Sequence, residues 1–311
     1  MKPEAHREIT AKAVDIFTTR SRSGFGQKLS TYADDVAKGS VEADRFPVFD
    51  RATNWHFYRE NKLLKATRFW GLFMVHPTSD HILGKRVKSL SQHIQQAESA
   101  PTPDKKDRAL RRAFELAGRA LHHIQDMSTP SHITPIYHGP DLPFNQIPGA
   151  WSVTDHYEEF TAGKTVMRSG LGKVTVSEDE IDRIRSRAAG ISLTGLYEEA
   201  AKRSLDIIFN DPASSFIDCT VNGKPSRIPL TMFWQKHSQS PDGGRVAGFG
   251  SFGPLEKVFD NPGRNIRDGD GNSYSFEADT LEKFCEQLFR KMVQDSLLGL
   301  FVVEKMMQSV N

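Results

Sequence analysis

Apolar side chains recur at the spacing of an α-helix in the first half of the chain. Residues 4–17 show this pattern, and residues 80–98 show it again. The clearest case is residues 105–127, in which apolar side chains three and four positions apart form one continuous face. Pro130 cannot continue such a helix and marks its end. We therefore predict three amphipathic helices before residue 130.

The second half of the chain adds further helices and one region of different composition. Residues 178–209 predict two helices that separate near Gly190, and residues 277–307 predict a closing helix or helix pair. Alternation of apolar and polar residues, the mark of a strand, is scarce. The pattern therefore predicts an all-α protein, a single-domain multi-helix bundle over residues 1–311 with a loop-rich insertion at about residues 211–275.

The insertion is rich in Gly, Pro, Ser and Asp. A short hairpin is predicted around Val221–Ile228, because Asn222–Gly223 is a pair that favours the positive φ angles of a tight turn. DGDGN at 268–272 is similar to a calcium-binding loop but lacks the acidic ligand needed further along, so we interpret it as a plain turn. Phe249 and Phe252 would suit the mouth of a site or a membrane contact, with a simple surface loop as the equal alternative.

Composition and charge restrict the class of protein. With 38% hydrophobic and 26% charged residues among 311, the chain can bury a substantial core. The formal net charge is +2, from 41 Lys and Arg against 39 Asp and Glu. This near-balance gives no basic excess for nucleic-acid phosphates and no strong attraction to anionic membranes.

The cysteine count and the lack of a long apolar run bear on zinc sites and location. Cys219 and Cys285 are too few for a CxxC-type zinc site or a disulfide scaffold, and we expect buried or free thiols. No apolar run approaches the ~18 residues of a membrane span, and MKPEAHREIT lacks the hydrophobic region of a secretory signal. We expect a cytoplasmic protein or one exported without a signal peptide, and we infer no obligate protein partner.

The positions of the eleven histidines indicate the chemistry of the chain. His122 precedes Asp126 by four residues, so on a helix both side chains share one face and can meet one cation. A carboxylate near a helix C-terminus opposes the helix dipole, which favours a functional role for Asp126. Pro130 ends the helix, and His132 can turn back toward the same cavity. The group predicts a metal site with nitrogen and oxygen ligands, which suits Zn²⁺; a hydrogen-bonded helix histidine without a ligand role is the alternative.

The segment HHIQDMSTPSH at residues 122–132 resembles the signature of the bacterial zinc-dependent phospholipases C. A His, an Asp four residues later, a Pro four beyond it and a His two further share the family's order and spacing. Three positions depart from the pattern: His123 replaces a Tyr, Gln125 a Gly or Thr, and Ile136 an Asn. The resemblance covers about residues 1–165 and includes the related single-strand nucleases of the same superfamily.

Further ligands follow from this resemblance. WHFY at 55–58 is similar to the family's His-Phe-aromatic segment and implies that His56 is a ligand. Asp44, twelve residues earlier, matches an acidic ligand, with Asp50 as its rival. Asp44 is also the catalytic candidate, since its family counterpart is thought to orient or deprotonate the nucleophile. Without the resemblance, Asp44 would be interpreted as a surface acid and His56 as a half-buried histidine between aromatic residues.

The start of the chain also matches the superfamily. His6 resembles the histidine of the family's first helix. Members of the superfamily use the amino nitrogen and carbonyl of the N-terminal residue as ligands, and in the fungal nucleases that residue stands five positions before the histidine. Met1 has this spacing from His6, and Lys2 disfavours removal of the initiator methionine. We therefore hypothesise that Met1 chelates zinc, with a disordered terminus as the alternative.

The last ligands that the resemblance implies are a histidine and an acid one helical turn later. TDHYEEF supplies His156 with Glu159 on the same helix face, and we prefer this pair. Glu158 is the rival acid, because the family places an aromatic residue before its glutamate, although Thr154 then takes the histidine position. His138 is another candidate.

The other histidines have no acidic neighbour at a spacing that fits this scheme. We interpret four of them as structural or solvent-facing: His76, His81, His93 and His237. His123 lies about 100° around the helix from His122, which favours packing over ligation.

The resemblance implies an enzyme with three zinc ions. One would take Asp44, His56, His122 and Asp126; a second the N-terminus, His6 and Asp126; a third His132, His156 and the glutamate. Zinc lowers the pKa of bound water toward about 7, so phosphate esters can be hydrolysed at neutral pH.

The branches of the superfamily differ in substrate. A phospholipase C would touch a membrane surface transiently and split a phospholipid such as phosphatidylcholine on the glycerol side of its phosphodiester. A nuclease would cut single-stranded nucleic acid. The HFY segment, the Asp–His interval and the S-T-P-x-H ending favour the phospholipase. A non-catalytic helical binding protein with a structural zinc is the alternative from another class.

Overall fold

The computed structural model describes most of the chain. The described residues are 1–21, 23–43, 56–58, 66–69, 72–75, 79–134, 136, 154–236 and 250–309. Helices account for the larger part of them. The α-helices are α1 (Pro3–Arg20), α2 (Gly24–Thr31), α3 (Ala33–Glu42), α5 (Ser79–Glu98), α6 (Pro103–Asp126), α7 (Pro130–Ile133), α8 (His156–Ala162), α9 (Lys164–Lys173), α10 (Glu178–Ala188), α11 (Leu193–Leu205) and α12 (Ala278–Gln308).

Three of the predicted helices begin at a residue whose side chain caps them. Thr102 accepts a hydrogen bond from the backbone N–H of Lys105, and Pro103 is the first residue of α6. Ser177 and Ser192 cap α10 and α11 in the same way. The two helices predicted within 178–209 are therefore confirmed. The closing segment is a single helix, α12, rather than a pair.

Short antiparallel strands accompany the helices, so the fold is helix-rich rather than strictly all-α. A four-stranded sheet has the order β4-β3-β8-β7. Two smaller ladders pair β1 with β2 and β5 with β6. The strands are β1 (Ala66–Phe69), β2 (Leu72–Val75), β3 (Phe216–Val221), β4 (Lys224–Pro229), β5 (Trp234–Gln235), β6 (Ser251–Phe252), β7 (Ile266–Arg267) and β8 (Ser273–Ser275).

Two turns in the insertion agree with the sequence prediction. Strands β3 and β4 form the expected hairpin, and its turn residues Asn222 and Gly223 have φ angles of 49° and 80°. The carboxylate of Asp268 accepts hydrogen bonds from the backbone N–H groups of Asp270 and Asn272 and from the hydroxyl of Tyr274. Its oxygens are thus hydrogen-bonded within the turn.

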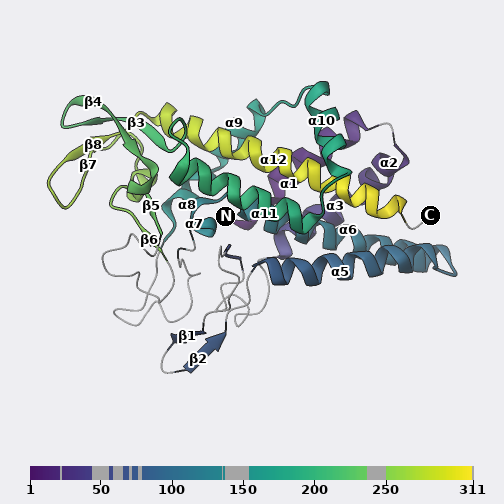
Figure 1. Cartoon of the computed structure of the whole chain (residues 1–311). Helices are drawn as coiled ribbons and strands as arrows, with labels where there is room; N and C mark the ends of the chain where they lie inside the picture. Colours follow the sequence, from purple (N-terminus) through teal and green to yellow (C-terminus); the bar gives the residue numbers. More distant parts are fainter. Residues whose placement is uncertain are drawn as a thin grey trace.

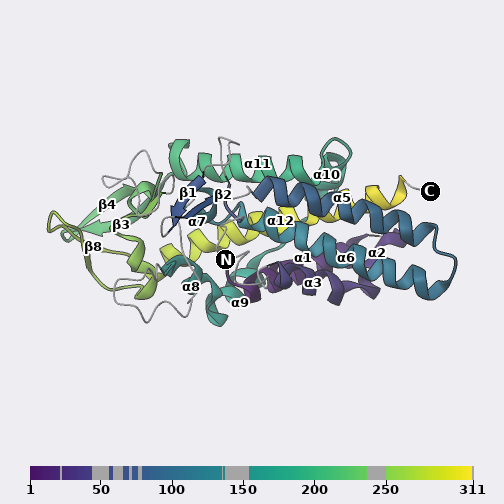
Figure 2. The same cartoon turned by 90° about the horizontal axis from the view of Figure 1, so that it is seen from below.

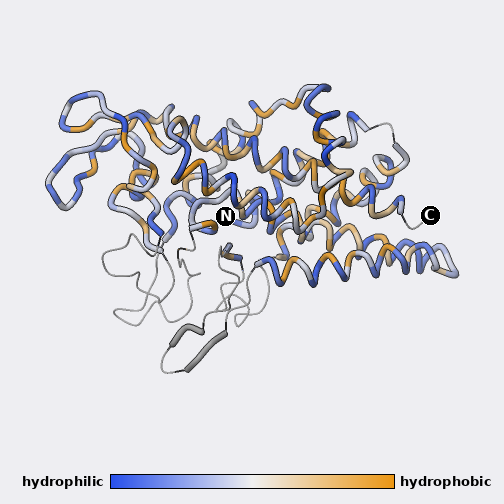
Figure 3. The backbone as a smooth tube through the Cα atoms, viewed as in Figure 1, coloured by the Kyte–Doolittle hydropathy of each residue, from blue (hydrophilic) through white to orange (hydrophobic). Residues whose placement is uncertain are grey.

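The long helices pack side by side around α12. Figures 1 and 2 show α12 running along the bundle, with the four-stranded sheet at the end away from the C-terminus. Residues 295–304 of α12 are all buried, which is typical of a central helix. Along the other helices apolar and polar positions alternate (Figure 3), as expected when one face lies against the core. No helix among the described residues has the length and apolar character to cross a membrane.

Helices α3 and α6 approach each other closely at two glycines. A Cβ atom added to Gly118 would lie 2.0 Å from the carbonyl oxygen of Val36, and one added to Gly39 would lie 2.0 Å from that of Glu115. Only glycine therefore permits this contact. It also brings the carbonyl of Ser40 within 2.8 Å of Nδ1 of His122, a residue of the predicted metal site.

We predict that Gly118→Ala lowers the free energy of unfolding by about 1–3 kcal/mol, because α3 and α6 must move apart. Gly84→Ala on α5 is the matched control. Its added Cβ meets no atom within 4 Å, and it should be neutral or stabilising by up to about 1 kcal/mol. Thermal unfolding of both variants tests this, and equal midpoints would contradict the steric argument.

Candidate metal centre

The last turns of α6 carry the residues that the sequence singled out first. His122 and Asp126 lie four residues apart, and both are fully buried. His122 Nε2 lies 3.1 Å from Asp126 Oδ2, so the two side chains share one helix face as predicted. His123, which is also fully buried, stands three residues before the same aspartate. The carboxylate thus lies one helical turn from two consecutive histidines.

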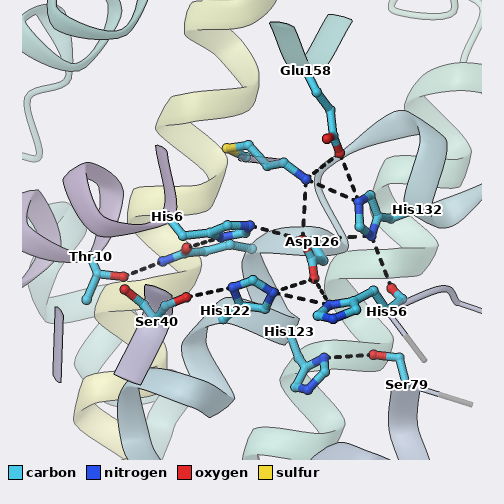
Figure 4. Close-up of polar contacts among 12 residues, drawn as sticks. His6, Thr10, Ser40, His56, Ser79, His122, His123, Asp126, His132 and Glu158 are labelled. Carbon is cyan, nitrogen blue, oxygen red and sulfur yellow. Dashed lines mark hydrogen bonds and ion pairs between the residues drawn. The ribbon is translucent and has the colours of Figure 1, made fainter. Parts of the chain in front are cut away.

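Residues from elsewhere in the chain meet this carboxylate, as Figure 4 shows. His6, on α1, brings Nε2 within 3.2 Å of Asp126 Oδ1. His56, in the segment 56–58, brings Nδ1 within 3.0 Å of Oδ2 and within 3.2 Å of His122 Nε2. Three histidines from separate parts of the sequence therefore surround one buried aspartate.

A second group lies beside the first, where α7, α8 and the N-terminus come together. Pro130 is the first residue of α7, and the short helix turns His132 back toward Asp126, with Nδ1 3.8 Å from Oδ1. The amino nitrogen of Met1 lies 3.1 Å from His132 Nε2 and 3.8 Å from Asp126 Oδ1, and it also contacts the carboxylate of Glu158. His132 Nε2 lies 3.0 Å from the same glutamate.

Hydrogen bonds to backbone carbonyls fix which ring nitrogen of His122 and of His132 faces a carboxylate. His122 donates through Nδ1 to the carbonyl of Ser40 at 2.8 Å. His132 donates through Nδ1 to the carbonyl of His56 at 3.2 Å. In both rings Nε2 is then the nitrogen directed at an acid, Asp126 for His122 and Glu158 for His132, an arrangement common among metal-binding histidines.

The orientation of His6 follows from a chain of hydrogen bonds through Gln125. The hydroxyl of Ser296 donates to the carbonyl of Met292, so its oxygen accepts from the amide nitrogen of Gln125. That amide also donates to Thr10, which leaves the Gln125 carbonyl oxygen to accept from His6 Nδ1 at 2.8 Å. His6 Nε2 therefore carries a lone pair.

The charge states of His6 and Asp126 make their close approach unusual. Burial lowers the pKa of His6, which favours the neutral ring. Burial alone would raise the pKa of Asp126, but the surrounding imidazoles, foremost that of His122, hold it well below its usual value. Neither His6 Nε2 nor Asp126 Oδ1 has a hydrogen-bond partner among the described residues. Two buried electron-pair donors thus face each other at 3.2 Å, and a cation between them would turn this repulsion into attraction.

The donor set fits a metal ion. Two groups each bring three ligand atoms within 4.8 Å of one another: His6 with His122 and Asp126, and His56 with His123 and Asp126. All are imidazole nitrogens or carboxylate oxygens, which suit Zn²⁺, and Asp126 is shared by both groups.

The acid beside His132 is Glu158 and not the preferred Glu159. Asp155 caps α8 by accepting a hydrogen bond from the N–H of Glu158, and this fixes where the helix begins. In that register Glu158 faces the N-terminus, whereas Glu159 is half exposed and pairs with Lys2. The rival acid Glu158 therefore belongs to the cluster around Asp126. The other members of this cluster are His6, His56, His122, His123, His132 and the amino group of Met1.

The structure also places His156 away from the cluster. Its Nδ1 contacts the carboxylate of Asp260, and its Nε2 lies 3.8 Å from a carboxylate oxygen of Glu256. Both acids come from the insertion, in a 3₁₀ helix of residues Glu256–Asp260. The preferred pair of His156 and Glu159 is thus replaced at the cluster by Glu158 alone.

Several predicted residues fall outside the described residues. They are Asp44, its rival Asp50, and His138, together with His76, His237 and Phe249. The catalytic role and the ligand role of Asp44 therefore stay predictions.

His123 is the cluster residue that the sequence argument set aside. A rotation of 100° from His122 suggested packing, yet the spacing of three residues to Asp126 is also a one-turn spacing. The three-residue interval between His123 and Asp126 is therefore the sequence signal that indicates a place for His123 at the site. Burial lowers the pKa of His123 well below its usual value, with a further contribution from the charge of Arg86, so the ring is neutral.

Glu256 is a second residue without a sequence signal. It is 1% exposed and accepts a hydrogen bond from the N–H of Tyr157 at 3.0 Å. It thereby holds the first turn of α8, the helix that carries Glu158. Burial, reinforced by the negative charge of Asp155, raises the pKa of Glu256 to about 8.

This shift predicts a pH-dependent stability. Because the pKa of Glu256 is raised on folding, its contribution is fully present below pH 4.5 and is lost as the pH rises toward about 8. Glu256→Gln keeps the acceptor without the ionisation, so its unfolding midpoint should fall less than that of the wild type over this interval. Parallel curves of midpoint against pH for the two proteins would contradict the prediction.

Comparison with known proteins gives no family for the chain. A scan against protein-family models found no model that matches, and a search of the curated proteins found no match. A functional assignment therefore has to be argued from the site itself.

Proposed function

We propose that the protein is a zinc-dependent hydrolase of phosphodiesters, with a phospholipase C as the first candidate. One observation carries the proposal: a neutral His6 and the Asp126 carboxylate, both fully buried, direct lone pairs at each other over 3.2 Å. Neither His6 Nε2 nor Asp126 Oδ1 has a hydrogen-bond partner among the described residues, and a cation bound between them would satisfy both atoms.

The cluster provides enough ligands for more than one ion. His6, His122 and Asp126 would hold one, and Asp126 would share its second oxygen with the ion beside His56. His132, Glu158 and the amino nitrogen of Met1 would hold a third. Glu158 thus replaces His156 and Glu159 in the scheme, and Asp44 keeps its predicted place next to His56.

Bound zinc would supply a water that ionises near neutral pH and positive charge for the phosphoryl oxygens. The chain's own part is to position these charges. Ser40 and Gln125 orient the rings of His122 and His6, and buried Asp126 stays ionised between them. The catalytic prediction for Asp44 is that it orients or deprotonates the attacking water.

The substrate class rests on the sequence resemblance. The phospholipase signature at residues 122–132 contributes His122, Asp126 and His132, which all lie in the cluster. The net charge of +2 gives no basic excess for a nucleic acid. We therefore place phosphatidylcholine, met at a membrane surface, before single-stranded nucleic acid, and extend the helical hydrolase domain over residues 1–311.

Two assays separate the candidates. The protein would be incubated with phosphatidylcholine vesicles and with single-stranded DNA, each with and without a chelator. Release of the phosphorylated head group that the chelator abolishes supports the phospholipase, and chelator-sensitive cutting of DNA supports the nuclease. A binding protein with a structural zinc would turn over neither substrate and would hold about one tightly bound ion.

We predict that Asp126→Asn abolishes turnover and lowers the zinc content while helicity stays largely intact. The amide removes the shared negative charge at the centre of the cluster. The matched control is Asp104→Asn, the same change at an exposed position on the same helix, which should keep both metal and activity. Elemental analysis and circular dichroism provide the readouts, and retained activity in Asp126→Asn would count against the whole scheme.

A second prediction concerns the amino nitrogen of Met1. One glycine added before Met1 would move the amine away from His132, Glu158 and Asp126. We expect a loss of about one zinc equivalent and of most activity, since one ligand is removed. A glycine added at the C-terminus is the control. Full metal content after the N-terminal addition would remove Met1 from the ligand set.

A further inference from the structure

His123 has no role in the scheme that the resemblance implies, because the family carries a tyrosine at this position. In this chain it is fully buried, and its ring centroid lies 5.4 Å from that of His56. Its ligand atom lies within 4.8 Å of those of His56 and Asp126. Figure 4 shows His123 on the same side of the cluster as His56.

The geometry points to His123 as a metal ligand, the third among the described residues, after His56 and Asp126, to face the ion at that end of the carboxylate. The inference rests on the proposed function. It adds one ligand, and it assigns the two consecutive histidines of α6 to two different ions. His122 would serve the ion shared with His6, and His123 the ion shared with His56. Two consecutive histidines can do this because Asp126 lies one turn from both.

The composition of each group supports this division. Each consists of two histidines and one oxygen ligand, and Asp126 is common to both. Three protein ligands with one open position form the usual arrangement of a catalytic zinc, and among the described residues His123 supplies the third beside His56 and Asp126, in addition to the predicted ligand Asp44. Asp126 can bridge because His6 lies on its Oδ1 side, whereas His56 and His122 lie on its Oδ2 side.

Ser79 provides the means to separate ligation from packing. Ser79 is the first residue of α5, and its hydroxyl lies 3.0 Å from Nδ1 of His123. A purely structural His123 would act through that hydrogen bond, by joining α5 to α6. Ser79→Ala removes the bond and keeps the ring, whereas His123→Phe removes the ring nitrogens and keeps most of the volume.

The experiment measures zinc per chain by elemental analysis, after loading with zinc and dialysis, in the wild type, Ser79→Ala and His123→Phe. We expect His123→Phe to hold about one equivalent less than the wild type, and Ser79→Ala to hold as much as the wild type. His123→Gln is the second variant if the phenylalanine does not fold, with the same expectation. Unfolding midpoints of the metal-free proteins report the structural contribution separately.

Each outcome decides one question. Unchanged zinc in both His123 variants, with a stability loss like that of Ser79→Ala, overturns the ligand role and leaves the proposed function intact. A wild type that holds no zinc overturns the proposed function itself. Loss of zinc in Ser79→Ala as well as in His123→Phe would overturn the simple ligand role, because it would trace the effect to the α5–α6 junction.

Discussion

The burial of one carboxylate, that of Asp126, is the constraint on which the arrangement of the helices depends. A charge removed from water costs several kcal/mol unless polar or cationic groups surround it. Its neighbours come from separate parts of the chain, namely His6 on α1, His56 before α5 and His132 on α7. These elements must therefore reach one point, and the bundle around α6 is the packing that allows it.

The supporting contacts explain why parts of the core look as they do. The glycines that let α3 approach α6 also bring the Ser40 carbonyl to His122. Gln125, fully buried although glutamine is mostly an exposed residue, joins His6 to α12 through Ser296. Polar groups within the bundle thus form a shell whose bonds fix ring orientation, and such shells tune metal ligands in general.

Local spacing is what the sequence could predict. The long helices, the hairpin turn and the pairing of His122 with Asp126 all follow from intervals of a few residues. The choice between Glu158 and Glu159 did not, because it depends on where Asp155 starts α8. His156 was also beyond reach, since Asp260, about a hundred residues later, contacts its ring. A long-range contact leaves no periodic trace in the sequence, and the pairing of β5 with β6 and of β8 with β3 was missed for this reason.

The insertion acquires a role in the site from these long-range contacts. Nothing in the resemblance applied to residues 211–275, and its aromatic residues suggested the mouth of a site or a membrane contact. Among its described residues, Glu256 accepts a hydrogen bond from the N–H of Tyr157, and Asp260 contacts His156, at the start of α8. Because Glu158 lies in that same turn, the described part of the insertion helps to set the position of a cluster residue. A helix of seven residues is too short to be stable alone, so this external support is what makes α8 a rigid carrier for the glutamate.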